Sequence, residues 1–406
     1  MISIERALEI VREALSASRH PKQTPSENVE LAACVGRILR EDIIADTDYP
    51  RFDKAIRDGF AVRAEDVANV PVVLKVISES RAGFPSSEPL TRGTCCEIMT
   101  GAPLPSGANA VVMVEHTERL SESEVRLLRS ARDGEGLLRR AAELREGDRV
   151  LSPGRRLQLA DTGTLANFGK ARVLVSKKPR VAILATGDEL VEVHETPEAG
   201  QIRNSNTYTL SAQVTEAGAE PVVLGIGRDN MDDLRARIGA GLEYDVLLVS
   251  GGVSMGKYDF VENVFAEFGV EVLFDSVAMK PGKPTVFGRR GKTFVFGLPG
   301  NPVSTIVAFH MFVRPVLRSL LGASDNEPVL LRARLETATK RDPARSAIVP
   351  AAVRFDGESY RIQTAPWKGS SDLAGVSLAN AMIVIPQGEG ALQPGDWAEF
   401  LLLERG

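Results

Sequence analysis

Glycine, asparagine and proline residues follow apolar runs in the middle of the chain, and their types suit them to bind an anion. Gly251 and Gly252 come directly after the run DVLLVS, and Asn301 with Pro302 comes shortly after TFVFG. Paired glycines let backbone N–H groups approach an anion without a Cβ in the way. Asn301 stands where a helix N-cap belongs and Pro302 fits the first helical position, so that helix N-terminus would face the same anion. A lone Gly-Gly is more often a plain turn, but further polar loops nearby favour a phosphate site.

A short basic loop would supply cations to this site. Lys280 and Lys283 lie in the segment KPGKP, and the chain has a formal net charge of −5. An acidic protein needs a local cluster of cations or helix N-termini to bind a phosphorylated anion. Two prolines and a glycine shape the loop, so both ammonium groups can be aimed at one anion. The alternative is a solvated basic turn, which a proline directly after each lysine makes less favourable.

Three carboxylates lie in the same set of loops. Glu189 follows the run VAILAT, Asp229 follows PVVLGI, and Asp259 comes shortly after the SGGVS segment. Carboxylates beside a phosphate site usually hold Mg²⁺, which neutralises both. Asp229 and Asp259 also stand next to expected helices and could be helix caps. Both interpretations stay open for these two residues.

The elements that position these loops form an alternating pattern between residues 178 and 322. Apolar strands alternate with amphipathic helices, which predicts a parallel sheet covered by helices on both faces. The loops would then meet at the carboxyl ends of the strands, where open α/β sheets bind ligands. The expected strands are 181–186, 221–226, 245–250 and 271–274, followed by two more β-like runs. One expected helix begins at Ser205, and three others cover 231–242, 259–268 and 302–321.

The remaining residues predict three other parts, so that the fold class is multidomain α/β and β. Residues 28–140 hold short β-like runs and predict a β-rich lobe. Residues 1–27 and 141–177 are expected to form a helical linking domain, with Ser3 as the cap of the first helix. Residues 323–406 return to β-like segments and predict a small, barrel-like C-terminal domain. The central domain at 178–322 carries the predicted site.

Composition excludes several classes of protein. A hydrophobic content of 43% and a charged content of 25% are typical of a soluble globular protein. No run of 18 apolar residues predicts a membrane span, and the N-terminus lacks the layout of a signal peptide, so we expect a cytoplasmic protein. No dense basic run with aromatic residues predicts nucleic-acid binding. Cys34, Cys95 and Cys96 are interpreted as core residues, and four scattered histidines give no zinc-site spacing.

Several long motifs resemble one known family. The segments TGDEL, QIRNSN, SGGVSMGKYDF, AMKPGKP and FGLPGNPVS resemble, in order and spacing, those of the MoeA/gephyrin E-domain family, the molybdopterin molybdenumtransferases. Upstream, FDKAIRDGFAV and IMTGAPLPSGANAVVMVE are similar to further segments of that family. The resemblance covers nearly the whole chain, and several long motifs in register are more specific than one glycine loop.

The resemblance implies a fold, an activity and an assembly. The family has an elongated four-domain subunit whose α/β domain binds molybdopterin, and it forms homodimers. The implied reaction is the insertion of molybdate into adenylylated molybdopterin, with release of AMP and with Mg²⁺ as the metal. The active site of the family lies between the α/β and C-terminal domains of one subunit and the β-rich lobe of the other. The molybdopterin adenylyltransferase, which catalyses the preceding step, is a candidate partner.

The resemblance also implies roles for particular residues. A guanidinium offers paired donors to oxyanion oxygens, which suits an arginine to molybdate. Asp58 and Thr100 would join the catalytic site from the lobe of the other subunit. The expected molybdate ligands are Ser254, Lys280, Lys283 and Arg345; the expected pterin or adenylate phosphate ligands are Gly251, Gly252 and Asn301; Glu189, Asp229 and Asp259 would hold Mg²⁺ or position water; and Ser370 and Ser371 match a glycine-serine segment of the last domain.

The sequence departs from the family pattern at three positions, Arg57, Lys257 and Ser346.

Other functions are alternatives to the molybdenum-inserting reaction. A molybdopterin adenylyltransferase shares the α/β domain, but is usually a single domain with SGGTG where this chain has SGGVS. A gephyrin-like scaffold is associated with an additional N-terminal domain and a long linker, which this chain lacks. A third alternative is a specialised paralogue that handles tungstate. The long flanking regions favour the molybdenum-inserting reaction.

Overall fold

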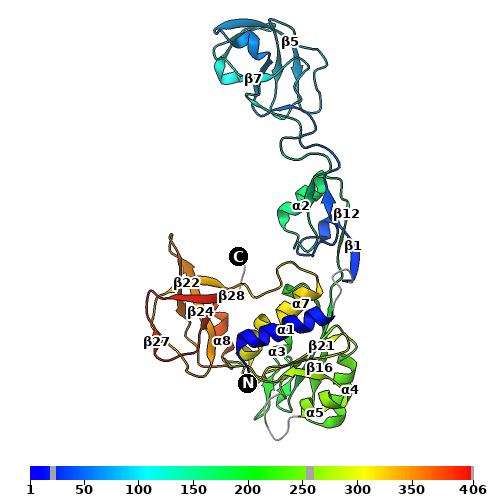
Figure 1. The fold of residues 1–406 in the computed structure, drawn as a ribbon, viewed down its shortest axis with the longest axis vertical. Helices are drawn as coiled ribbons and strands as arrows, with labels where there is room; N and C mark the ends of the chain where they lie inside the picture. The colour runs from blue at the N-terminus through cyan, green and yellow to red at the C-terminus, as the bar shows by residue number, and fades with distance from the viewer. Residues whose placement is uncertain (19–23, 253–259, 404–406) are drawn as a thin grey trace.

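The computed structural model describes residues 1–18, 24–252 and 260–403 of an elongated chain. A β-rich lobe lies at one end of the long axis, a small middle body follows, and the α/β and C-terminal β domains lie side by side at the other end (Figure 1). Ser254, Lys257 and Asp259, which the sequence analysis singled out, lie outside the described residues.

The α/β domain is built on a six-stranded sheet of order β16-β13-β17-β21-β20-β18. The four strands from β16 to β21 are parallel, as the sequence predicts. Each of the four strands with predicted bounds forms within a residue of them, and two further strands form where β-like runs were expected. The strands are β13 (Arg180–Thr186), β16 (Glu220–Gly227), β17 (Val246–Ser250), β18 (Glu271–Phe274), β20 (Val286–Arg290) and β21 (Thr293–Leu298).

One edge of the parallel sheet is antiparallel, which the strand pattern in the sequence does not specify. Strand β20 runs antiparallel to β21, and β18 runs antiparallel to β20. Arg290 pairs with Thr293, so that only Gly291 and Lys292 join the two strands, and Gly291 has a φ of 58°. A parallel connection needs a crossover of a dozen or more residues, whereas a two-residue turn can make only a hairpin. The short turn therefore sets the antiparallel edge.

Helices cover both faces of this sheet, as predicted. Alternate residues of β13 point to opposite faces, so Val181 and Ile183 belong to one hydrophobic cluster and Ala182 and Leu184 to another. Helices α1 (Ile4–Ser18), α3, α6 and α7 contribute to the first cluster, and α4 and α5 contribute to the second. Their bounds are α3 (Asn206–Glu216), α4 (Met231–Gly241), α5 (Phe260–Glu267), α6 (Pro302–Ala308) and α7 (Arg314–Leu320), with a π-helical turn, η5 (Phe309–Val313), between the last two.

The continuous helix Pro302–Leu320 is the one helix in the described part of the chain that is long and apolar enough to cross a membrane. Of its most apolar window, 78% is buried inside the protein. Its side chains form much of the larger cluster of the α/β domain. Burial against the sheet accounts for its apolar composition, as expected for a core helix.

The first helix, α1 (Ile4–Ser18), begins after Ser3, whose hydroxyl accepts a hydrogen bond from the Arg6 N–H at 3.2 Å. The apolar side of α1 packs on η5 and α7, within the core of the α/β domain. The sequence predicts that residues 1–27 group with residues 141–177. Strand β1 (Ser26–Glu30) does pair with β12 (Arg172–Ser176), whereas α1 packs on the α/β domain.

The middle body and the lobe are both rich in β structure. In the middle body, β2 pairs with β11 and α2 packs beside β12 (Figure 1). The lobe holds a six-stranded sheet of order β7-β4-β6-β5-β9-β8. The bounds are β2 (Ile43–Ile44), β3 (Lys54–Ala55), β4 (Gly59–Val62), β5 (Val72–Ser80), β6 (Thr94–Ile98), β7 (Ala110–Met113), β8 (Thr117–Ser121), β9 (Glu124–Leu127), β10 (Leu137–Leu138), β11 (Arg149–Leu151) and α2 (Leu159–Asn167).

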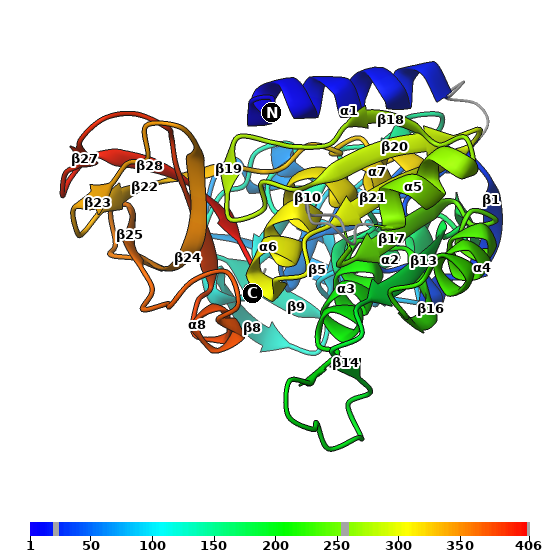
Figure 2. The ribbon, with the colours of Figure 1, turned by 90° about the horizontal axis from the view of Figure 1, so that it is seen from below.

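The C-terminal domain is a closed five-stranded barrel, as the sequence led us to expect. Strand β24 pairs with both β25 and β26, which closes the order β24-β25-β22-β28-β26. A two-residue strand of the basic loop, β19 (Met279–Lys280), adds to β24 and lies between the barrel and the α/β domain (Figure 2). The barrel strands and nearby elements are β22 (Leu331–Leu335), β23 (Thr339–Lys340), β24 (Ser346–Phe355), β25 (Tyr360–Thr364), α8 (Leu373–Ser377), β26 (Ala381–Ile385), β27 (Ala391–Leu392) and β28 (Trp397–Leu402).

Candidate functional site

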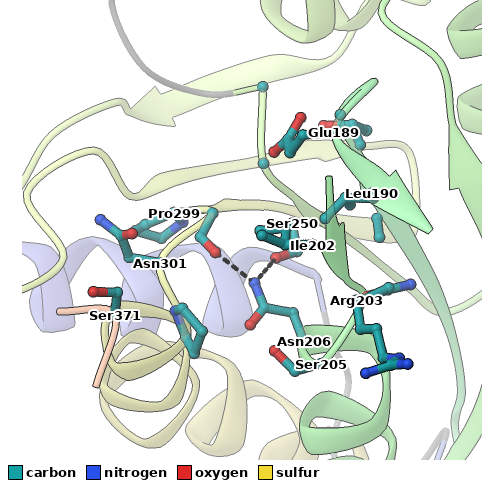
Figure 3. A pocket seen from close by; sticks show the side chains of 18 of the residues that line it. Glu189, Leu190, Ile202, Arg203, Ser205, Asn206, Ser250, Pro299, Asn301 and Ser371 are labelled. Carbon is teal, nitrogen blue, oxygen red and sulfur yellow. Dashed lines mark hydrogen bonds between the residues drawn. The ribbon is translucent and has the colours of Figure 1, made fainter. Parts of the chain in front are cut away.

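A pocket of about 630 Å³ opens at the carboxyl ends of β13, β16, β17 and β21 (Figure 3). The four polar loops predicted from the sequence all contribute to its wall, together with one segment of the C-terminal domain. A short pair of strands, β14 (Leu190–Val191) and β15 (Ile202–Arg203), forms a further part. The predicted site residues that line this pocket are Glu189, Asp229, Gly251, Gly252, Asn301 and Ser371.

The glycine pair after β17 allows close backbone contact inside the pocket. Gly251 has a φ of 97°, and a Cβ at this position would lie 2.4 Å from the carbonyl oxygen of Thr186. Its N–H donates to the Leu298 carbonyl at 3.0 Å, so this N–H serves the fold rather than an anion. Gly300 lies next to it, because a Cβ on Gly300 would be 3.7 Å from the Gly251 Cα. The loops after β17 and β21 therefore meet backbone to backbone.

Asn301 is the N-cap of α6 and Pro302 is its first residue, as predicted. The Asn301 side chain makes no capping hydrogen bond and is exposed at the pocket. The N–H of Val303 is not free for an anion, since it donates to the Ser370 carbonyl at 3.0 Å. This bond joins the segment that carries Ser371 to the start of α6. It explains how a residue of the C-terminal domain reaches a pocket of the α/β domain.

Two of the three predicted metal ligands line the pocket. The carboxylate of Glu189 folds back over Gly187, where a Cβ would lie 2.4 Å from Glu189 Oε2. Asp229 is not the cap of the following helix, because Asn230 holds that position and accepts a hydrogen bond from the Asp233 N–H at 2.9 Å. The capping interpretation of Asp229 is therefore wrong. Within the described ranges, no group of three His, Cys, Asp or Glu residues could hold a metal ion.

A second pocket, of about 490 Å³, lies where the basic loop meets the barrel. Lys280 lines it, and its Nζ lies 4.0 Å from Asp342 Oδ2. The Arg345 guanidinium lies 3.7 Å from the same oxygen. The N–H of Ala344, followed by the charges of Arg345 and Lys280, lowers the pKa of Asp342. Two cations expected to bind one oxyanion thus lie around one carboxylate.

Lys283 lines neither of these two pockets, and its side chain is exposed. Its neighbour Pro284 lines the first pocket, while Lys280 lines the second. The KPGKP loop therefore runs from one pocket to the other. Binding of a single anion by both lysines stays a prediction.

Asp58 and Thr100, which are 42 positions apart, meet in the lobe. Asp58 Oδ1 accepts a hydrogen bond from the Thr100 N–H at 2.6 Å and from its hydroxyl at 2.8 Å. These two bonds lower the pKa of Asp58. Both residues are exposed, and within one chain the lobe lies at the opposite end of the long axis from the pocket (Figure 1). Asp58 and Thr100 therefore contact each other, but they lie far from the pocket of the same chain.

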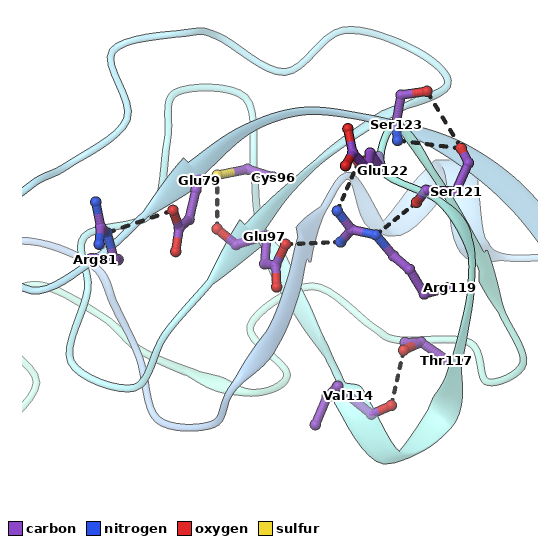
Figure 4. Close-up of polar contacts among 10 residues, drawn as sticks. All are labelled: Glu79, Arg81, Cys96, Glu97, Val114, Thr117, Arg119, Ser121, Glu122 and Ser123. Atoms are coloured by element: carbon purple, nitrogen blue, oxygen red, sulfur yellow. Dashed lines mark hydrogen bonds and ion pairs between the residues drawn. The ribbon is translucent and has the colours of Figure 1, made fainter.

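A network of polar contacts links strands beside this pair (Figure 4). Arg119 of β8 donates to the Glu97 carboxylate of β6 at 2.8 Å and to the Ser121 carbonyl at 2.8 Å. Its guanidinium also lies 5.7 Å from the ring centroid of Phe60 on β4. Because β4 begins just after Asp58 and β6 ends just before Thr100, these contacts support the strands that position the pair.

Asn206, which was not among the predicted site residues, also lines the first pocket. Its side-chain N–H groups donate to Ser250 Oγ at 2.9 Å and to the Gly300 carbonyl at 2.8 Å. The signal was present in the motif QIRNSN, which places a polar cluster directly before a helix. Arg203 of the same motif lines the pocket as well.

Three family descriptions match successive parts of the chain. Residues 2–169 match "MoeA N-terminal region (domain I and II)". Residues 182–319 match "Probable molybdopterin binding domain", and residues 332–403 match "MoeA C-terminal region (domain IV)". Together these matches include the lobe, the pocket and the barrel.

Similar proteins extend over nearly the whole chain. The molybdopterin molybdenumtransferase of Nostoc sp. is 37% identical over 383 residues, which cover 92% of this chain and 88% of that protein. The molybdopterin molybdenumtransferase of Bacillus subtilis is 36% identical over 390 residues, which cover 94% and 91%. The crystal structure of the molybdopterin biosynthesis MoeA protein of Pyrococcus horikoshii OT3 has a TM-score of 0.83 at 29% identity, and covers 99% of this chain and all of the other.

Proposed function

The chain belongs to the MoeA family, the molybdopterin molybdenumtransferases of molybdenum cofactor biosynthesis, and we propose that it inserts molybdate into adenylylated molybdopterin with release of AMP. One observation supports the proposal most strongly. The first pocket, with its glycine-containing loops at the strand ends, is connected by the KPGKP loop to the second pocket, which is lined by cationic side chains. A phosphorylated pterin and a separate oxyanion could thus be bound next to each other.

The first pocket would hold the phosphorylated part of the substrate. Gly252 and Asn301 line the wall where two glycine-containing loops meet; Gly252 leaves the backbone open to a ligand, and the exposed Asn301 side chain offers an amide to it. Ser371 adds a hydroxyl from the C-terminal domain. Gly251 acts through its small size, since any Cβ there would collide with Thr186.

The second pocket would hold molybdate before its transfer. Lys280 and Arg345 share Asp342 in the described structure, so the carboxylate holds both cations near one position. An oxyanion would compete with Asp342 for the same N–H donors, and paired guanidinium donors favour such an anion. Lys283 and Ser254 are proposed as further ligands; Lys283 is exposed on the connecting loop, and Ser254 lies outside the described residues.

The donor set at the first pocket fits Mg²⁺. Mg²⁺ is usually bound by one or two carboxylates together with substrate phosphates and water. Glu189 and Asp229 provide two carboxylates on the wall of a phosphate-type pocket, and Asp259 remains a proposed third ligand outside the described residues. When bound, Mg²⁺ would offset negative charge on the phosphoanhydride. The role of this chain is to present the carboxylates and to orient the anhydride between the glycine loops.

The assembly is proposed to be a homodimer in the cytoplasm. Asp58 and Thr100 form an ordered, exposed pair at the end of the chain opposite the pocket, so only a second copy could bring such a pair to it. Molybdopterin adenylyltransferase is a proposed partner, because it would supply the adenylylated substrate. Nucleic acid and membranes are not expected as partners.

The proposal is tested by incubating the purified protein with adenylylated molybdopterin, molybdate and Mg²⁺. We expect molybdate-dependent release of AMP and reconstitution of a cofactor-free molybdoenzyme. No AMP release with molybdate would reject the proposal. Adenylation of molybdopterin from ATP would instead support the adenylyltransferase alternative. A parallel reaction with tungstate decides whether the chain is a tungstate-specific paralogue.

A further inference from the structure

Asn206 joins three segments of the pocket wall through one side chain. It is the first residue of α3, and it donates to Ser250 at the end of β17 and to Gly300 after β21 (Figure 3). A longer contact of 3.5 Å reaches the Thr305 hydroxyl on α6. One amide therefore bridges α3 and both glycine-containing loops.

The hydrogen-bond partners define the orientation of this amide. The Gly300 carbonyl can only accept, so the atom that faces it must be the nitrogen. The Asn206 Oδ1 is then buried and has no hydrogen-bond partner among the described residues. A buried acceptor without a partner costs free energy. The Asn206 nitrogen thus bonds to both pocket loops, while its Oδ1 is left without a hydrogen bond among the described residues.

We propose that Asn206 is a positioning residue, which holds the loops after β17 and β21 at the spacing at which they bind the phosphate of the pterin substrate. This inference rests on the proposed function. Asn206 acts through Ser250 and Gly300 and not by contact with the reacting atoms. Gly251 is tied to the end of β21 by its hydrogen bond to Leu298, whereas Gly300 touches Gly251 without a side chain to hold it, so the amide adds the side-chain link to Gly300.

The test uses Asn206→Asp and Asn206→Ala in the full chain, with binding of purified molybdopterin measured by its fluorescence. An ionised carboxylate has the shape of the amide but cannot donate to the Gly300 carbonyl. We expect about tenfold weaker binding for both variants at pH 8. Affinity of Asn206→Asp should recover toward the wild-type value as the pH falls and the carboxyl gains a proton to donate. Asn206→Ala should show no such recovery, and a purely structural role would produce no difference between the variants.

Asn380→Asp is the matched control. The Asn380 side chain also bridges backbone groups, since it accepts from the Val353 N–H at 2.8 Å and donates to the Val353 carbonyl at 2.9 Å. It lies in the barrel and lines neither pocket. This variant should lower the midpoint of thermal unfolding and leave molybdopterin affinity unchanged.

The outcomes separate the inference from the function on which it rests. If the wild type binds molybdopterin and both Asn206 variants bind within twofold of it, the positioning role is rejected and the proposed function stands. If the wild type itself does not bind molybdopterin, both are rejected. Should Asn206→Asp fail to fold, Ser250→Ala removes one of the two acceptors that lie within 3 Å. If the single variants Ser250→Ala and Asn206→Ala both bind molybdopterin with wild-type affinity, the positioning role of Asn206 is then rejected.

Discussion

The carboxylate of Asp58 accepts two hydrogen bonds from Thr100, one from its backbone N–H at 2.6 Å and one from its hydroxyl at 2.8 Å. Both bonds favour the ionised carboxylate, and they lower the pKa of Asp58. The ionised Asp58 therefore stabilises the folded protein at pH values above the pKa that it has in the unfolded chain. This stabilisation is lost as the pH falls through the lower pKa of the folded state. The pair is therefore charged and ordered at neutral pH before any partner or substrate arrives.

The first prediction concerns the hydroxyl of this pair. Thr100→Val keeps the backbone N–H but removes the hydroxyl donor, so the pKa of Asp58 should rise toward its ordinary value. Titration of the Asp58 carboxyl carbon by NMR measures this change. Thr117→Val is the control, because its hydroxyl donates to the Val114 carbonyl in the same lobe. An unchanged Asp58 titration in Thr100→Val would contradict the role of the hydroxyl.

The second prediction concerns the three cysteines, all of which are buried. Burial raises the pKa of Cys95 to about 12 and also raises the pKa of Cys34 and Cys96. At pH 8 the Cys95 thiol would therefore be ionised in only about 1 molecule in 10,000. Because the thiolate is the reactive form, Cys95 should react very slowly. A thiol reagent should label none of the cysteines in the native protein and all three in guanidinium. Rapid labelling of a native thiol would show that the interpretation as core residues is wrong.

The third prediction concerns the close approach at Gly251. Gly251→Ala requires a left-handed backbone, which costs about 1–2 kcal/mol, and it also places a Cβ 2.4 Å from the Thr186 carbonyl. Gly269→Ala is the control, because Gly269 has a φ of 68° and open space where its Cβ would be. Urea unfolding should show a larger loss of stability for Gly251→Ala. Only Gly251→Ala should also weaken molybdopterin binding, and equal losses in both variants would contradict the packing argument.

Local patterns predicted most of the α/β domain because each element carried its own signal. The alternation of Val181 and Ile183 with Ala182 and Leu184 marks a strand buried on both faces, and both clusters form around it. The antiparallel edge was missed because an apolar run gives no direction for its strand. The turn Gly291-Lys292 carried that information. The packing of α1 was also missed, since an amphipathic helix shows that it has a buried side but not which core receives it.

The position of the pocket could be predicted because polar residues directly follow the strands, whereas the contacts between distant segments of its wall could not be predicted. The four polar loops do meet in one pocket, because parallel strands bring their carboxyl ends to one edge. The motif QIRNSN marks Asn206 only as part of a polar cluster before a helix, and it does not reveal hydrogen bonds to residues 44 and 94 positions away. The Val303–Ser370 bond, which joins the last domain to α6, also links residues that are far apart in sequence. Only the folded chain shows such links.

The last prediction concerns the exposed lysine of the basic loop. Lys283→Ala removes one ammonium group between the two pockets and should raise the KM for molybdate about tenfold, as expected for the loss of a charged hydrogen bond. Stability should not change, because the side chain is exposed. Lys292→Ala is the control: Lys292 is also exposed, but it lies in the turn before β21, at the sheet edge opposite the pocket. Molybdate-dependent AMP release and the midpoint of thermal unfolding are measured for both. A wild-type KM in Lys283→Ala would remove this lysine from the site, whereas an equal rise in both variants would point to a general effect of net charge.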